Sequence, residues 1–428
     1  MIGALVASCG ALWVSSASAQ GEAGRAPAVA AVCLDQDQSN ASVPAELCGR
    51  LALWLDASER WALAPVDQAL ATGGDFDPVV AVRQAEELLE AARAEYSAGD
   101  RKKGLRLHEE AAEAFIVLDP WLADRDQLAT ALLDLMAAQM ALLKPRDAWR
   151  ADETAVRLLN FVPSIRETWR EKLRPGPQVD RLEAISGRLT EQKGGLELRC
   201  ATDPCEVYID GGFAGVTPLK LGAVPAGEHL VRVRRSGYVP QSRVVAVSPE
   251  DTNTQAFTLD RAQGYTAYTQ TLERLPSEIG APRAGTALGD LRALLVVDQV
   301  VALRVLPADE SGQSVLEAYL YDLRSDQLLG AVDLPVRLDT GTEYGRVVAT
   351  LMEELLAAQE RALVAAQGDD EDGGVASFLN TWWFWTGVGA AVLVGGTVGL
   401  VLALDDEAAP VAAGPKPDPN AGTIRLNF

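Results

Sequence analysis

Histidine is almost missing from this chain, which has two in 428 residues, His108 and His229. Few side chains are therefore available to bind a metal or to act as an imidazole acid or base. No cysteine or other histidine stands at ligand spacing from His108 or His229. The sequence also lacks a phosphate-binding loop, a zinc-binding histidine pair and a nucleophile elbow. We therefore expect no catalytic residue, no metal and no cofactor, and predict that the protein is not an enzyme.

Positive charge is scarce as well. Lys and Arg number 38 against 60 Asp and Glu, which gives a formal net charge of −22. Nucleic acid needs a basic face against its phosphates, and docking on anionic lipid needs a polybasic patch, so the composition argues against both. The 48% apolar and 23% charged residues are instead typical of globular chains. A chain of this length predicts about two to four domains.

One long uncharged segment, residues 382–404, lies near the end of the sequence. As a helix it is long enough to cross about 30 Å of hydrocarbon. Aromatic residues open it, where amphipathic rings suit the headgroup layer of a membrane: Trp382, Trp383, Phe384 and Trp385. We predict a single transmembrane helix followed by a short tail over 405–428. The alternative is a buried core helix.

Small residues recur every four positions within this segment, at Gly387, Ala391, Gly395 and Gly399. This spacing puts them on one helical face, which lets two helices approach closely. The pattern predicts a homodimer formed through the span. The alternative is that glycine is simply frequent in membrane helices.

The first residues are typical of an exported protein. Residues 1–19 are apolar and small and end in the motif ASA, as in a cleaved secretory signal, although no Lys or Arg precedes the apolar run. The motif VASC, which ends at Cys9, loosely resembles a lipoprotein box, so lipidation of Cys9 is the alternative. With the span, export predicts a single-pass inner-membrane protein of a bacterial envelope, with its N-terminal body in the periplasm.

Removal of Cys9 leaves an even number of cysteines, which in an oxidising compartment indicates disulfides: Cys33, Cys48, Cys200 and Cys205. Four cysteines allow three pairings. We expect Cys33–Cys48 and Cys200–Cys205, because each pair falls inside one predicted domain. The alternative is buried free thiols.

Two separated stretches predict mixed structure. Residues 28–75 form a small α/β element that begins with an apolar strand over 28–34. Residues 286–366 predict an α+β domain of a short helix, three strands and a long helix, which vaguely resembles the N-terminal modules of periplasmic TolB-like proteins. We hypothesise that the strand near residue 30 pairs with this domain, so that the parts between are insertions. Residues 264–285 are predicted to be a linker.

Residues 77–192 have helical spacing throughout. Asp77-Pro78 predicts an N-cap with proline in the first turn, and Gly99-Asp100 predicts a break between two helices. The hairpins resemble tetratricopeptide repeats through turn and spacing residues: Tyr96, Gly99, Asp100, the pairs Gly104/Ala111 and Ala148/Ala155, Pro120 and Pro163. The resemblance implies a groove that binds peptides or a partner protein. The alternative is a plain helical bundle that supports its neighbours.

Residues 195–260 change to the alternation of strands with tight glycine turns. This stretch resembles the PEGA domain, a small β-sandwich of bacterial envelope and surface proteins, through these residues: Asp210, Gly211, Gly215, Thr217, Pro218, Gly227, Gly237 and Tyr238. Ala226 departs from the tetrad that names the family. The resemblance implies contact with sugar or cell wall. Asp210 is expected to hydrogen-bond the backbone of its own turn, rather than to act as a catalytic acid.

Together these patterns predict a multidomain α+β protein with a helical-repeat domain, a small β-sandwich, an α+β domain and one C-terminal transmembrane helix. The expected function is a non-enzymatic envelope scaffold or adaptor. Its helical repeats would bind a protein partner and its sandwich would contact cell-wall polysaccharide or another envelope component. The alternative is a periplasmic ligand sensor that signals through the span.

Overall fold

The computed structural model describes residues 26–34, 42–71, 76–122, 124–142, 149–166, 168, 176–186, 193–338 and 343–368. The predicted signal peptide, the segment 382–404 with its aromatic and small-residue positions, and the tail lie outside these residues. Within the part of the chain that is described, no helix has the length and apolar character to cross a membrane.

A five-stranded sheet joins the two ends of the described chain, in the order β12-β11-β10-β1-β2. The N-terminal strand β1 (Ala28–Leu34) runs parallel to β10 (Gln299–Leu306), with Val29 opposite Gln299 and Leu34 opposite Arg304. The other strands are β2 (Ala62–Leu63), β11 (Ser314–Asp322) and β12 (Gln327–Val336). The hypothesis that the strand near residue 30 pairs with the C-terminal α+β stretch is confirmed.

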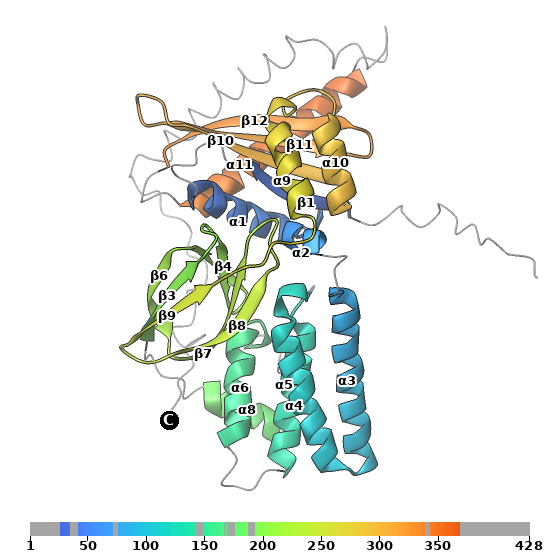
Figure 1. The fold of residues 1–428 in the computed structure, drawn as a ribbon, viewed down its shortest axis with the longest axis vertical. Coiled ribbons are helices and arrows are strands. Elements are labelled where there is room, and N and C mark those ends of the chain that lie inside the picture. The colour runs from blue at the N-terminus through green and yellow to red at the C-terminus, as the bar shows by residue number, and fades with distance from the viewer. Residues whose placement is uncertain are drawn as a thin grey trace, which may run out of the picture.

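Helices cover both faces of this sheet, so β1 is apolar on both sides, as a central strand between two helical layers requires. One face carries α1 (Ser42–Asp56) and α11 (Tyr344–Gly368). The other carries α2 (Val66–Ala71), α9 (Tyr265–Arg274) and α10 (Thr286–Leu295). Figure 1 shows this α/β/α unit at the top of the molecule, above the two other parts.

The predicted linker over 264–285 is wrong in its first half. Residues 265–274 form α9, which continues into a short 3-10 turn, Leu275–Ser277. Tyr268, Thr271 and Leu275 point into the core at helical spacing and are nearly inaccessible. The sequence did not predict this helix because its buried face is narrow and includes a threonine, Thr271, so the apolar periodicity is weak.

The two parts between α2 and α9 are insertions, and the chain leaves and re-enters the α/β unit at neighbouring positions. The Gly264 N–H donates to the Leu70 carbonyl over 3.0 Å, so the chain returns to the place where it left the α/β unit. A Cβ at residue 264 would lie 2.8 Å from the Leu70 Cδ2, which only glycine avoids. An insertion whose ends meet leaves the parent core undisturbed.

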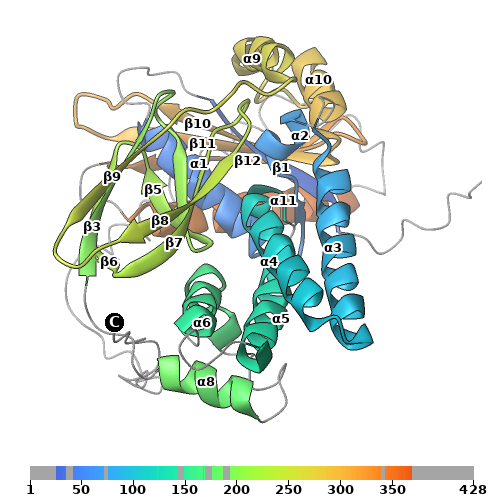
Figure 2. The same ribbon diagram turned by 60° about the horizontal axis from the view of Figure 1, so that its bottom comes forward.

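The first inserted part is helical: α3 (Pro78–Ala98), α4 (Arg101–Val117), α5 (Asp126–Leu142), α6 (Trp149–Phe161) and α8 (Pro177–Ser186). The predicted caps are present. The Asp77 carboxylate accepts from the N–H groups of Val79 and Val80, and Gly99, at φ 99°, ends α3. Consecutive helices pack side by side around Phe115, Leu132 and Phe161 (Figure 2).

The second inserted part is a sandwich of two sheets, β6-β3-β9 and β5-β4-β7-β8. Its strands are β3 (Lys193–Cys200), β4 (Glu206–Ile209), β5 (Gly212–Val216), β6 (Leu219–Pro225), β7 (Gly227–Arg234), β8 (Gln241–Val247) and β9 (Thr252–Phe257). The predicted alternation is confirmed in β3, where Leu196 and Leu198 are fully buried and meet Val231, Val233 and Phe257 from other strands.

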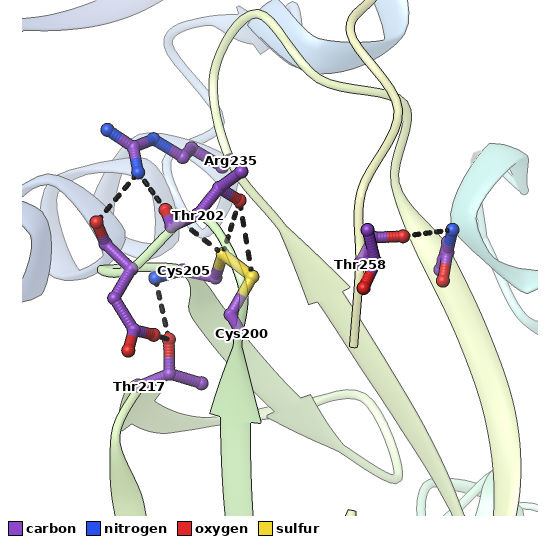
Figure 3. Close-up of a disulfide and its surroundings, with 8 residues drawn as sticks. Cys200, Thr202, Cys205, Thr217, Arg235 and Thr258 are labelled. Carbon is purple, nitrogen blue, oxygen red and sulfur yellow. Dashed lines mark hydrogen bonds between the residues drawn. A yellow bond between two sulfur atoms is a disulfide. The ribbon is translucent and has the colours of Figure 1, made fainter. Parts of the chain in front are cut away.

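Both predicted disulfides are present. Cys33–Cys48 joins β1 to α1, and Cys200–Cys205 closes the turn between β3 and β4. Figure 3 shows the second disulfide at the end of the sandwich, beside Thr202 and Arg235.

Candidate binding cleft

The β-sandwich motif residues build turns. Gly211, Gly215, Gly227 and Gly237 all have positive φ. The requirement is strongest at Gly211, where φ is 89° and an added Cβ would lie 2.7 Å from Nη1 of Arg125. This arginine belongs to the helical part, so the glycine allows the two parts to approach closely.

Thr217 holds the disulfide turn together. Its side chain is fully buried, and its Oγ1 accepts from the Cys205 N–H and donates to the Asp203 carboxylate (Figure 3). Pro218 follows Thr217 and directly precedes β6. Tyr238 packs edge-on against Tyr265 of α9, with ring centroids 5.2 Å apart, and so joins the sandwich to the α/β unit. These motif residues therefore stabilise the fold and its junctions.

Asp210 has a structural role, but not the one expected. Its carboxylate reaches across to β7, where Oδ1 accepts from the Leu230 N–H at 2.9 Å and Oδ2 lies 2.5 Å from Nδ1 of His229. The sequence prediction of a bond to its own turn is wrong, because a φ of 53° at Asp210 turns the side chain toward the neighbouring strand.

The sequence analysis assigned no structural role to His229. Its Nε2 lies 2.7 Å from the Pro225 carbonyl, so both ring nitrogens face acceptors, an arrangement that favours the imidazole with a proton on each nitrogen. Burial alone would lower the pKa of His229, but the hydrogen bond and charge of Asp210, with the Pro225 carbonyl, raise it above its usual 6.5. Protonated His229 and the Asp210 carboxylate form a buried ion pair, and this pair holds the turn before β7 in place.

That turn docks against the last long helix of the helical part. Arg157 of α6 donates from Nε to the Glu228 carboxylate at 2.6 Å, and the Asn160 amide donates to the Glu228 carbonyl at 3.0 Å. A second contact lies further along, where the Ser242 hydroxyl donates to Asp119 at 2.8 Å. Figure 2 shows α6 beside β7 and β8. These contacts set the helix and the sandwich at a defined separation.

A cleft of about 640 Å³ lies between them. Its helical wall presents Trp149, Asp152, Glu153 and Val156, which follow one face of α6 at i, i+3, i+4 and i+7. Its sandwich wall is formed by the turn at 226–228 and by the β8 end, residues 246–249. Trp149 is 60% exposed, although large aromatic side chains usually avoid water.

The charges in this cleft have one sign. The charged residues in its walls are Asp152, Glu153 and Glu228. Arg181 and Arg157 pair with the first and third of them, each at 2.6 Å. Glu153 is exposed, and its charge also acts on Arg157. Apolar walls with an acidic rim and an indole face favour an apolar segment that carries a cationic side chain.

Sequence reasoning did not single out this cleft. Trp149 has a detectable signal, since an aromatic residue and two carboxylates share one helical face with Val156. The other wall comes from residues roughly 70 to 100 positions later, and no local pattern predicts that they meet. No group of side chains suited to a metal ion occurs in the ranges that the structure describes.

Comparison with known families identifies one part of the chain. Residues 197–263 match the PEGA domain family, as the sequence motifs predicted. This range begins in β3 and ends just before α9, so it spans most of the sandwich. No curated protein matches the sequence.

Proposed function

We propose that this chain, whose sandwich is a PEGA domain, is a non-enzymatic adaptor of a bacterial envelope that binds a protein partner in the cleft between α6 and β7. The observation that carries the proposal is the exposed Trp149 in a cleft whose charged wall residues are all acidic. Interfaces concentrate affinity in a few large aromatic anchors, and Trp is enriched among them.

The compartment is inferred from the cysteines. One disulfide joins β1 to α1, and the other closes the turn between β3 and β4. Such bonds persist mainly outside the cytoplasm. We place the body in the periplasm, held by the span over 382–404, with the helical hairpins acting as tetratricopeptide-like repeats. Cell-wall polysaccharide is the second contact that we assign to the PEGA domain.

The partner segment is defined by the chemistry of the walls. A Lys or Arg side chain would lie over the Trp149 ring and near the exposed Glu153 carboxylate, which combines a cation–π contact with charge attraction. Apolar neighbours in the same segment would contact Val156 and Ala226 at the base of the cleft.

The test places a photo-crosslinking amino acid at position 149 of the full-length chain in cells. The matched control is position 117, where Val117 is 69% exposed on α4 and does not line the cleft. We expect a discrete crosslinked partner from 149 and none from 117. The Glu153→Lys variant should remove the crosslink. Equal crosslinking from both positions, or no effect of Glu153→Lys, would contradict the proposal.

A ligand sensor is the second candidate, favoured by one observation: a cavity with two arginines in its wall lies between the PEGA domain and the α/β unit. A bound ligand there could change how the PEGA domain sits on the α/β unit. The two functions are separated by partner crosslinking at position 149 with and without ligand, because an adaptor needs none.

A further inference from the structure

A cavity of about 240 Å³ lies at the junction of the PEGA domain, the first strand and helix, and α9. The PEGA domain contributes Glu206, Arg234 and Arg235. The α/β unit contributes the Cys33–Cys48 disulfide, and α9 contributes Tyr265 and Tyr268. Cavities between domains are preferred places for small ligands, since several elements can each supply one group.

The cavity wall carries a surplus of positive charge. Its charged residues are Arg234, Arg235 and Glu206, two cations against one carboxylate. Behind this wall, Asp67 and Arg232 act on the Glu206 carboxyl, and Asp56 acts on the Arg234 guanidinium. The cations thus line the cavity, whereas two of the three carboxylates that balance them lie behind its wall.

The two guanidinium groups retain free donors. The Arg234 Nε pairs with Glu206 at 3.0 Å and with Asp67 at 3.8 Å, whereas its Nη1 and Nη2 donate no hydrogen bond to any described residue. The Arg235 Nη1 donates to the carbonyls of Thr202 and Asp203, which leaves Nη2 unused among those residues (Figure 3). Both arginines line the cavity, so an acceptor group on a ligand bound there can reach these unused donors.

The rest of the wall is mainly aromatic and apolar. Tyr268 is almost fully buried and Tyr265 is half-buried, and Leu272 and Pro44 add apolar surface beside the hydroxyl-bearing Ser236 and Thr269. This lining suits a flat or apolar body better than a second charged group. Because the charges in and behind the wall balance, a monoanion also fits better than a phosphate dianion, which would add more negative charge beside Glu206.

We propose that this cavity binds a small organic monocarboxylate, with its carboxylate on the Arg234 and Arg235 guanidiniums and an apolar or aromatic body between Tyr265, Tyr268 and Leu272. Guanidinium groups match carboxylates in shape and donate two parallel hydrogen bonds to them. Because the ligand contacts the PEGA domain and the α/β unit at once, its binding stabilises their arrangement. This site stands on its own observations and does not depend on the adaptor proposal.

The experiment measures binding of benzoate and of benzamide, its neutral isostere, to the full-length chain by calorimetry and thermal unfolding. We expect benzoate to bind saturably and raise Tm, as any ligand of the folded state does. Benzamide should bind at least about tenfold more weakly, the usual cost of losing a charged hydrogen-bond partner. Inorganic phosphate should bind more weakly than benzoate.

Arg235→Gln should weaken benzoate binding at least about tenfold. Its matched control is Arg243→Gln, because Arg243 also donates to a backbone carbonyl of the PEGA domain, that of Ala256, but lies away from the cavity. Thr269→Phe, which fills the cavity from α9, should abolish binding if Arg235→Gln fails to fold. Equal binding of benzamide, tighter binding of phosphate, equal effects of the two arginine variants, or no benzoate binding would each overturn the proposal.

Discussion

The Asp210 carboxylate and the His229 imidazole form a buried ion pair, with 2.5 Å between Oδ2 and Nδ1. His229 is 2% exposed, and its other nitrogen faces the Pro225 carbonyl. The pair closes the PEGA turn that forms one wall of the acidic cleft, so the charge state of one histidine supports the geometry of the binding site.

Stability should therefore fall as pH rises through the raised pKa of His229. The folded-state pKa lies above the unfolded value of about 6.5, so the folded chain binds more protons there. The contribution is fully present below about pH 6.5 and is lost above the folded pKa, and it amounts to about 1.4 kcal/mol for each pH unit that separates the two pKa values. Urea unfolding at several pH values should show this loss in the native chain and not in His229→Asn. Buried Glu206, whose pKa is also raised, is common to both proteins and cancels in the difference.

The contribution of His108 to stability depends on pH in the opposite direction. Burial lowers the pKa of His108, with a smaller opposing effect from Asp134, so the unfolded chain binds more protons. Its contribution is present above the unfolded pKa of about 6.5 and is lost as pH falls through the folded pKa. His108→Gln should therefore reduce the loss of stability on acidification, again followed by urea unfolding. If the two histidine variants changed the pH dependence in the same direction, one of the two assignments would be wrong.

Trp149→Ala should weaken binding of the crosslinked partner with little effect on folding. The side chain is 60% exposed, so its truncation removes few internal contacts. A central aromatic anchor contributes about 2 kcal/mol, which corresponds to a roughly 30-fold higher Kd. Titration of the partner against the purified chain measures the change, and Val117→Ala is the control. An unchanged Kd would show that Trp149 is not an anchor.

The two disulfides should contribute unequally to stability. They close loops with sequence separations of 15 and 5. Loop-closure entropy then predicts a loss of about 3 kcal/mol for Cys33→Ser/Cys48→Ser and about 2 kcal/mol for Cys200→Ser/Cys205→Ser. Denaturant unfolding of each double variant checks the order, and a larger loss at the PEGA disulfide would contradict the prediction.

The α/β unit should fold without its insertions. Residues 26–71 joined to residues 264–368 by a short Gly-Ser linker retain β1, β10 and the helices on both faces, and Gly264 already contacts Leu70. We expect a cooperative thermal transition and protected amides in β1 and β10. The matched control begins at residue 264 and lacks β1, which exposes the β10 edge, and it should be unfolded or aggregated. If the joined chain were unfolded, the inserted parts would be required for folding.

The sequence alone predicted much of the local structure. Asp77, Gly99 and Asp100 mark helix ends through the hydrogen bonds that their own types can make. Alternation in Leu196–Cys200 predicted a strand, and the spacing of the glycine turns predicted the PEGA fold. The cysteine pairing followed from domain membership. Each of these signals lies within a few residues of the structure that it specifies.

Tertiary structure decided the candidate sites. The β1–β10 pairing joins residues about 270 positions apart, and the sequence supported it only as a hypothesis. Neither Trp149 nor Arg234 has any local feature that identifies its neighbours across the cleft or the cavity. The Asp210–His229 ion pair likewise depends on how β4 and β7 align. Periodicity records which side of an element is buried, whereas the packing of distant elements determines which polar groups meet there.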